Sequence, residues 1–212
     1  MRAPPLVLAS SSPRRRDVLG RLGLAFEVLP PPDGTEATWS GGEPPGPFAL
    51  RLAEAKASAV ATLQPAALVL AADTIVVLDG TVLGKPADAE DARAILTRLA
   101  GRDHTVYTAL ALAAPGPRRA AGVEATMVRF RDLEPNEIEA YVATGEPLDK
   151  AGAYGIQAYG ASLVAGVSGC YFNVMGLPVA RLLALLREIG WEYRAPGRLR
   201  PVGEPGRPFS AA

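Results

Sequence analysis

The sequence is short of the residues that build metal clusters, disulfide frameworks and membrane spans. Among its 212 residues are one cysteine, Cys170, and one histidine, His104. A lone cysteine excludes a disulfide framework and a cysteine-ligated zinc site, and it is typical of a reducing compartment. No uncharged apolar run reaches the roughly 18 residues that a transmembrane helix needs, and the first residues lack a signal-peptide pattern. We therefore expect a cytoplasmic protein with no membrane partner.

The sequence also has no excess of either charge, with 22 basic and 22 acidic residues. A balanced charge gives no overall positive field for nucleic acid, so we expect no nucleic-acid partner. Lysine is scarce, since only Lys56, Lys85 and Lys150 stand among the 22 basic residues. An ammonium is a compact point charge that a planar guanidinium does not replace. The three lysines are therefore candidate site residues, and chance survival at solvated positions is the alternative.

Strand and helix patterns alternate along the chain. Apolar runs predict strands at residues 6–9, 25–29, 66–78, 81–83, 104–114, 121–130 and 162–167. Amphipathic spacing and capping signals predict helices at residues 13–22, 48–63, 88–101, 135–143 and 177–189. This order predicts an α/β fold: a mixed twisted sheet with flanking helices and a central cleft.

Proline and glycine concentrate in two segments. Residues 30–47 are too long for an ordinary connection, so we expect either a mobile lid or a disordered loop. From residue 195 onward proline, glycine and arginine dominate, which predicts a disordered tail over 195–212. No other segment has the composition of a linker, so residues 1–194 are expected to form a single domain.

The first candidate site is the segment from Ser10 to Arg16, where the first strand meets the first helix. Hydroxyls (Ser10 and Ser12 among them), free backbone N–H groups and arginines converge there on the positive end of a helix dipole, which suits phosphate. Arginines in a first helical turn oppose the dipole, and a bound anion resolves that conflict. We expect phosphate to bind here; a capped helix with solvated arginines is the alternative.

The second candidate is Asp73-Thr74, which interrupts the apolar run 68–78. A carboxylate in such a run is costly to bury unless it finds a cation. At the carboxyl end of a strand it would face the crevice where α/β sheets bind ligands. One interpretation is a metal-bound carboxylate that orients or deprotonates water. The other is a turn residue whose carboxylate caps nearby amides.

Two further segments carry unusual polar residues. Lys85 lies between a glycine and a proline, a setting that can aim its ammonium into a cleft, although a surface turn is the alternative. The spacing around it is not that of a Walker A loop. The glycine-rich segment 148–157 has adjacent opposite charges, Asp149 and Lys150, and ends in Gln157. The amide of Gln157 has a donor and an acceptor, the groups needed to read the edge of a base.

Neither His104 nor Cys170 has the surroundings of a catalytic nucleophile. His104 lies in a predicted strand, and we interpret it as structural. Cys170 has no second histidine or other suitable partner in the sequence.

Five segments, taken in order, resemble Maf proteins. They are Ala-Ser-Ser-Ser-Pro-Arg-Arg at 9–15, Ala-Asp-Thr at 72–74, Gly-Lys-Pro at 84–86, Asp-Lys-Ala-Gly-Ala-Tyr-Gly-Ile-Gln at 149–157 and Asn-Val-Met-Gly-Leu-Pro at 173–178. The resemblance covers residues 5 to 192 and implies a fold similar to that of inosine triphosphatases. It also implies hydrolysis of a nucleoside triphosphate between the α and β phosphates, with a divalent cation (Mg²⁺, Mn²⁺ or Co²⁺). The segment 149–157 resembles the branch that acts on dTTP and UTP, and the family suggests a homodimer.

The resemblance also implies roles for individual residues. Asp73 matches the general base of the family. The specificity positions match Arg14, Thr74 and Gln157, and the basic residues around the phosphates match Arg15, Lys56 and Lys85. The family usually carries an acidic pair after the second strand, whereas here residues 32–36 read Pro-Asp-Gly-Thr-Glu, with Asp33 and Glu36 as the acids. Either could supply the acid; we take Glu36, with Asp73, as the expected metal ligand.

We therefore expect a nucleoside triphosphate pyrophosphatase that acts on dTTP and UTP. One alternative keeps the chemistry but changes the substrate to a modified nucleotide such as pseudo-UTP, 5-methyl-UTP or 7-methyl-GTP. The other is a nucleotide-binding regulator of septum formation that needs no catalysis, since Maf proteins are linked to inhibition of that process.

Overall fold

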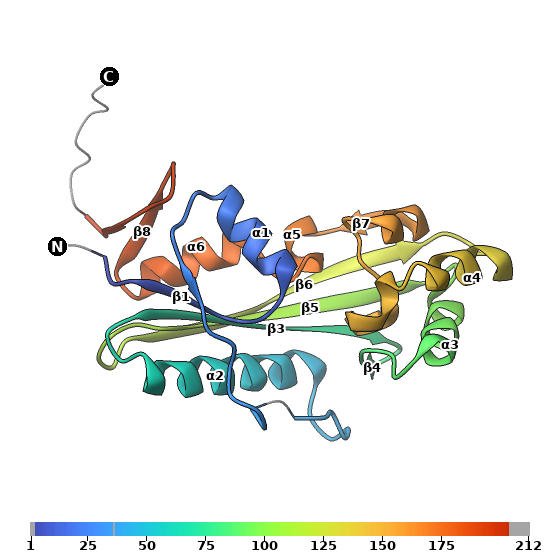
Figure 1. Cartoon of the computed structure of the whole chain (residues 1–212), viewed down its shortest axis with the longest axis horizontal. Helices are drawn as coiled ribbons and strands as arrows, with labels where there is room; N and C mark the ends of the chain where they lie inside the picture. The colour runs from blue at the N-terminus through green and yellow to red at the C-terminus, as the bar shows by residue number, and fades with distance from the viewer. Residues whose placement is uncertain (1–2, 36, 204–212) are drawn as a thin grey trace.

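The computed structural model describes residues 3–35 and 37–203, which form a mixed sheet between helices (Figure 1). The sheet order is β2-β1-β3-β5-β6-β7, with β4 also paired to β3. β1 is parallel to β2 and β3, and the other pairs are antiparallel. The predicted mixed α/β fold is thus confirmed. The strands are β1 (Leu6–Ala9), β2 (Glu27–Val28), β3 (Leu68–Leu78), β4 (Thr81–Leu83), β5 (Asp103–Ala113), β6 (Arg119–Phe130) and β7 (Val164–Ser168).

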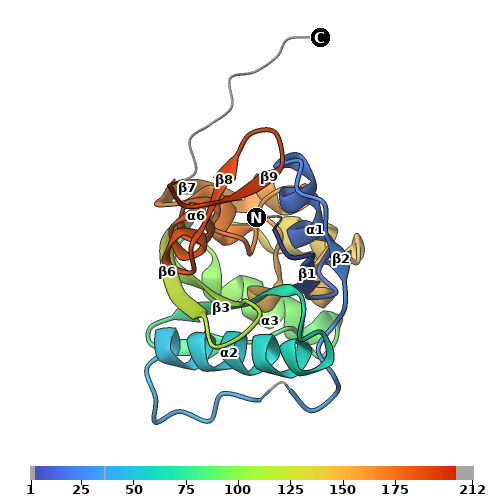
Figure 2. The same cartoon turned by 90° about the vertical axis from the view of Figure 1, so that its left-hand side faces the viewer.

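The helices cover both faces of this sheet. Figures 1 and 2 show the long helix α2 along one face and α1, α5 and α6 on the other. The helices are α1 (Pro13–Arg21), α2 (Pro45–Leu63), α3 (Ala89–Leu99), α4 (Pro135–Ala143), α5 (Tyr171–Val174) and α6 (Val179–Glu188). Three 3₁₀ turns, η1 (Glu146–Asp149), η2 (Ala151–Ala153) and η3 (Tyr159–Leu163), lie within and around the glycine-rich segment 148–157. No helix in the described part of the chain is both long and apolar enough to span a membrane.

Strand β3 is buried on both faces, and its side chains alternate between two cores. Val69 and Ala71 pack in the cluster that α2 covers, whereas Leu70 and Ala72 pack in the cluster on the other face. Successive side chains of a strand point to opposite faces. Asp73 therefore points to the α2 face, and its neighbour Thr74 points to the face of α1 and α5.

One edge of β3 is interrupted. β5 pairs with β3 from Val69 to Val77 and so occupies one edge throughout. On the other edge β1 pairs only with residues 68–71, and β4 pairs only with residues 76–78. Within the described chain, residues 72–75 have no strand beside them on that edge. The sheet thus has a gap between the carboxyl end of β1 and strand β4.

The predicted tail is wrong for its first residues. Arg198–Pro201 forms strand β9, which pairs with β8 (Trp191–Arg194) in an antiparallel hairpin. The hairpin packs on the core: Trp191 is buried, and the Tyr193 hydroxyl donates to the Leu22 carbonyl at 2.7 Å. These aromatic anchors lie in β8, before the predicted tail, so the tail was predicted from its proline, glycine and arginine content alone. Residues 204–212 lie outside the described residues, and the single domain over 1–194 stays a prediction.

The segment 30–47 is also shorter as a loop than predicted. Helix α2 begins at Pro45, so residues 29–44 connect β2 to it and the last three residues of the predicted loop belong to the helix. Trp39 packs against the α2-face core, and its indole N–H donates to the Glu43 carbonyl. That it is a lid stays a prediction.

Candidate active site

A cavity of about 320 Å³ occupies the gap in the sheet. Its walls come from the end of β1, the first turn of α1, the middle of β3, the segment after β4, residues 149–157 and the end of α5. Every predicted site residue that the structure describes, apart from the alternative acid Asp33, lines it: Ser10, Ser12, Arg14, Arg15, Lys56, Asp73, Thr74, Lys85, Asp149, Lys150 and Gln157. Glu36, the other predicted metal ligand, lies outside the described residues. Segments far apart in sequence thus meet in one hollow.

Asp73 forms a buried ion pair with Lys56 of α2. The Lys56 ammonium donates to Asp73 Oδ1 at 2.7 Å, and the two residues are only 6% and 9% exposed. Burial of either charge alone would be strongly unfavourable. The opposite charge of each residue therefore explains how the other can be buried. Asp73 Oδ2 makes no hydrogen bond within the described part of the chain. The pair therefore presents a carboxylate oxygen at the α2 side of the cavity.

Arg15 connects the elements on the other side of β3. Its Nε donates to the Gly176 carbonyl at 2.9 Å, its Nη1 to Ser10 Oγ at 2.9 Å, and its Nη2 to Thr74 Oγ1 at 3.0 Å. These bonds fasten α1 to the end of β1, to β3 and to the turn after α5. Arg15 was expected to contact phosphate, and in the structure these three nitrogens are directed at protein acceptors. Its part in phosphate binding stays a prediction.

Ser12 is the residue before α1, as predicted, but its hydroxyl makes no capping hydrogen bond. Instead the Ser12 backbone N–H donates to Ser10 Oγ at 3.2 Å. The first turn of α1, Ser10 and Ser12 all border the cavity. A helix start of this kind has backbone N–H groups that can bind an anion.

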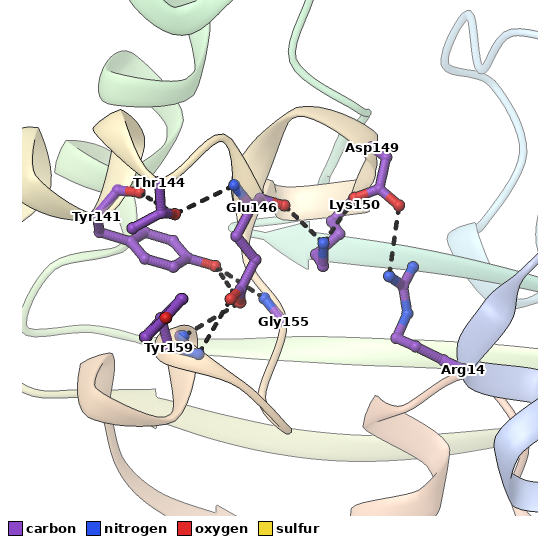
Figure 3. A network of polar contacts seen from close by, with 9 residues as sticks. Arg14, Tyr141, Thr144, Glu146, Asp149, Lys150, Gly155 and Tyr159 are labelled. Carbon is purple, nitrogen blue, oxygen red and sulfur yellow. Dashed lines mark hydrogen bonds and ion pairs between the residues drawn. The ribbon is translucent and has the colours of Figure 1, made fainter.

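The outer rim of the cavity carries charges of both signs (Figure 3). Arg14 lies 3.6 Å from Asp149, and the Lys150 ammonium donates to Asp149 Oδ1 and to the Glu146 carbonyl, both at 2.6 Å. Burial raises the pKa of Asp149, but the hydrogen bond and charge of Lys150 and the charge of Arg14 hold it below its usual value. Lys85 is exposed and has no partner in the described part of the chain. The rim thus has a charged group available to a ligand.

A clamp that the sequence analysis missed holds the segment bearing Gln157. The Glu146 carboxylate accepts hydrogen bonds from the Tyr141 hydroxyl at 2.9 Å and from the backbone N–H groups of residues 159 and 160 at 3.0 and 3.2 Å (Figure 3). The Tyr141 hydroxyl in turn accepts from the Gly155 N–H at 3.1 Å. Burial raises the pKa of Tyr141, so the phenol stays protonated and can donate. Both ends of the segment 155–160 are therefore fixed by two side chains.

His104 contacts a residue of the cavity wall, which agrees with the interpretation of this histidine as structural. Its Nε2 lies 2.8 Å from the hydroxyl of Tyr154, which lines the cavity. Burial lowers the pKa of His104 to about 4, against a small raising effect of Asp103. The imidazole is therefore neutral at pH 7, and its contact with Tyr154 connects it to the cavity.

The donor set suits a metal ion that arrives with phosphate. The described residues contain no cluster of three or more metal-binding side chains. Asp73 supplies one buried carboxylate on the α2 side of the cavity. Mg²⁺ is typically held by one or two carboxylates, substrate phosphates and water. Asp73 therefore fits such an ion in the presence of a phosphorylated ligand.

Comparison with known proteins gives one consistent family. The family model described as "Maf-like protein" matches residues 5–189. A dTTP/UTP pyrophosphatase of Pelotomaculum thermopropionicum is 50% identical, over 88% of this chain and 97% of its own length. Enzymes of the same name from Moorella thermoacetica and Anaeromyxobacter dehalogenans are 54% and 52% identical, over 87% and 89% of this chain and 95% and 96% of their own lengths.

Two solved structures are more distantly similar. One is a nucleoside-triphosphatase / dITP/XTP pyrophosphatase from Mycobacterium abscessus, with 17% identity and a TM-score of 0.40 over 66% of this chain and 95% of the other. The second is a HAM1 protein from Coxiella burnetii, with 17% identity and a TM-score of 0.43 over 87% and 99%.

Proposed function

The chain belongs to the Maf family, and we propose on that premise that it hydrolyses dTTP and UTP to the monophosphate and pyrophosphate. Relatives 50% to 54% identical over nearly their whole length carry the name dTTP/UTP pyrophosphatase. The observation that carries the proposal is the buried Asp73–Lys56 pair, which opens on the same cavity as Arg14, Lys85 and Gln157. A carboxylate, cations and a base-reading amide then act on one ligand.

The cations of the cavity would hold the triphosphate. Lys85 is exposed at the rim without a protein partner in the described chain, and Arg14 and Lys56 line the same space. The start of α1 adds backbone N–H groups that suit phosphate. Charge that develops on the leaving pyrophosphate is stabilised by such preorganised groups more than in water. Phosphate binding is the role we assign to this part of the cavity.

Asp73 is the proposed general base. Its free oxygen would accept the proton of a water molecule that attacks the α phosphorus, and the bond to the β-phosphate oxygen then breaks. Lys56 holds the carboxylate at 2.7 Å, which fixes its orientation. A divalent cation (Mg²⁺, Mn²⁺ or Co²⁺), held by Asp73 and phosphate oxygens, would supply further charge neutralisation on the triphosphate. Whether Glu36 is a second ligand stays a prediction.

Gln157 and Thr74 are the proposed readers of the base. Both line the cavity, and Gln157 is held on the segment that Glu146 and Tyr141 clamp. Uracil and thymine present two carbonyl oxygens around an N–H, a pattern that an amide and a hydroxyl can match. Arg14 borders the same space and is the third expected specificity residue.

The buried Asp73–Lys56 pair favours an enzyme over a regulator that only binds nucleotides. Such a regulator needs cations for the phosphates, but a buried carboxylate beside them would repel the ligand. The alternative substrates from the sequence analysis, a modified pyrimidine nucleotide or 7-methyl-GTP, stay predictions. The cytoplasmic location and the homodimer stay predictions.

Nucleotide hydrolysis tests the proposal directly. The protein is incubated with dTTP, UTP, CTP, dATP, dGTP and 7-methyl-GTP plus Mg²⁺, and pyrophosphate and monophosphate are quantified. We expect equal amounts of both products, formed fastest from dTTP and UTP. Release of inorganic phosphate alone, or no product from any nucleotide, would contradict the proposal.

A further inference from the structure

A chain of hydrogen bonds runs from the cavity into the core through two threonines. Arg15 Nη2 lies 3.0 Å from Thr74 Oγ1, which lies 3.0 Å from Thr108 Oγ1. Thr108 Oγ1 in turn lies 2.8 Å from the carbonyl oxygen of Asn173. Thr74 and Thr108 face each other because β3 and β5 pair at these two residues.

The direction of every proton in this chain is determined. A carbonyl oxygen only accepts, so the single hydroxyl proton of Thr108 is donated to Asn173. Thr108 then has no proton for Thr74, so the Thr74 hydroxyl must donate to Thr108. A guanidinium has no acceptor, so Arg15 donates to Thr74. The order is Arg15 to Thr74 to Thr108 to Asn173.

Asn173 holds the far end of the chain in place. It is fully buried, and its Nδ2 donates to the Val106 carbonyl at 2.9 Å and to Thr126 Oγ1 at 3.0 Å. Its backbone carbonyl is therefore fixed against Thr108, which is itself fully buried. No water reaches this end, so Thr108 has no alternative acceptor within the described chain.

This order leaves the Thr74 oxygen with one remaining lone pair and no proton to offer. A hydroxyl has one donor and two acceptor sites, and here the donor and one acceptor site are used. Thr74 is half-buried and lines the cavity, as does Gly176. A Cβ at residue 176 would lie 3.2 Å from Thr74 Oγ1, so the missing side chain leaves this oxygen uncovered. The cavity thus contains an oxygen that can only accept.

We propose that Thr108 is a specificity-determining positioning residue, because it makes Thr74 an acceptor that selects a ring N–H. This inference rests on the proposed function. Uracil and thymine carry a proton on N3 and can donate to Thr74. Cytosine N3 is itself an acceptor, so it would face Thr74 with two lone pairs and no proton between them. Leaving such groups unpaired in a buried site costs affinity and rate.

Replacement of Thr108 by valine tests this role. Thr108→Val keeps the shape but removes the acceptor of the Thr74 proton, so Thr74 can turn that proton toward the cavity and donate to cytosine N3. We expect the ratio of kcat/KM for CTP to that for UTP to rise about tenfold. UTP hydrolysis is expected to change little, because Thr74 still has lone pairs for its N–H. Thr108→Ser keeps the hydroxyl and should retain the wild-type ratio.

A coupled variant separates this effect from a loss of packing. In a Thr74→Val background the reader is gone, so adding Thr108→Val should leave the CTP to UTP ratio unchanged. Equal losses for both substrates in Thr108→Val, or a ratio like that of the wild type in a protein that melts cooperatively, would overturn the inference.

Failure of this inference can be distinguished from failure of the proposed function. If the wild type releases no pyrophosphate from UTP, the proposed function fails, and the inference is tested by calorimetric titration with UMP and CMP. In Thr108→Val the affinity for CMP relative to that for UMP is expected to rise by the same factor of about ten. An unchanged affinity ratio would overturn the inference on its own.

Discussion

Asp73 and Thr74 are adjacent in sequence, but the two sides of β3 that they face are built differently. On the α2 side the polar groups are a buried ion pair, Asp73 with Lys56. On the other side the contacts of Thr74 run from Arg15 through neutral hydroxyls to a backbone carbonyl. Charges act strongly on other charges in a poorly solvated site, whereas ordered neutral groups discriminate by donor and acceptor pattern. The Asp73–Lys56 pair suits phosphate chemistry, and the chain of hydroxyls suits recognition of an uncharged ring.

The largest expected effect is on the charged side. Asp73→Asn keeps the shape but removes the proton acceptor, so kcat should fall about 10³-fold while affinity for a non-hydrolysable UTP analogue is largely retained. Pyrophosphate release and calorimetry measure the two quantities. Asp149→Asn makes the same chemical change at the exposed rim, and its loss should stay below about tenfold. A kcat above about a tenth of the wild-type value would show that Asp73 is not the base.

Removal of the cation should instead affect stability. Lys56→Met leaves the buried Asp73 carboxylate without this partner, and the free energy of unfolding should fall by about 3 kcal/mol. Urea unfolding at pH 7 measures it. Lys85→Met removes an exposed lysine and should change stability by less than about 0.5 kcal/mol. Similar values for the two variants would mean that the ion pair contributes little to the fold.

Acid should lower the free energy of unfolding through His104, the hydrogen-bond partner of Tyr154. Its pKa is lowered to about 4 in the folded protein, against roughly 6.5 when unfolded. Between these values the unfolded state binds the proton, so stability is fully present above pH 6.5 and is lost as the pH falls toward 4. At pH 5 the loss is about 2 kcal/mol relative to pH 7.

Urea unfolding at several pH values checks this loss. His104→Gln offers a polar partner to the Tyr154 hydroxyl and does not titrate, so its stability should depend less on pH between 7 and 5. A variant with the same pH dependence as the wild type would assign the acid sensitivity to other groups.

The smallest expected effect distinguishes recognition of the base from binding of the triphosphate. Gln157→Ala should lower kcat/KM for dTTP and UTP about tenfold and for CTP much less, because its amide matches only the first pattern. Lys85→Ala should weaken all three about equally, since each presents the same triphosphate. Steady-state kinetics on three nucleotides suffices. Equal losses across the substrates in Gln157→Ala would remove this residue from base recognition.

Local signals were enough to predict most of the fold. Helix α4 has the predicted bounds, Pro135 to Ala143, because proline, capping residues and a closing glycine all lie within a few residues. The turn between β3 and β4 lies at residues 79–80, between the predicted strands 66–78 and 81–83. Strand β9 was missed because its stability comes from pairing with β8 and from contacts of the hairpin with Leu22. Those contacts are distant in sequence and leave no local pattern.

The sequence predicted the site residues whose side chains are chemically distinctive in their local segment. It did not predict which residues contact them in the folded chain. Asp73 was conspicuous as a carboxylate in an apolar strand, but nothing in its segment identified Lys56 as its partner. Thr108 and Glu146 were missed for the same reason. Thr108 matters only because the register of β5 sets it against Thr74, and Glu146 matters only because the chain folds residues 155–160 onto it. Strand register and loop closure are features of the tertiary structure, so local sequence does not reveal them.

The gap in the sheet edge at residues 72–75 has a consequence for genetics. Ala72, Asp73 and Thr74 line the cavity along an edge that no strand covers in the described chain. Main-chain N–H and C=O groups on such an edge are available to a bound molecule. Codon changes other than those to proline alter side chains and leave those groups in place, so a mutational scan without proline would be blind to any contact they make. Replacing an amide there by an ester in a semisynthetic chain would reveal it.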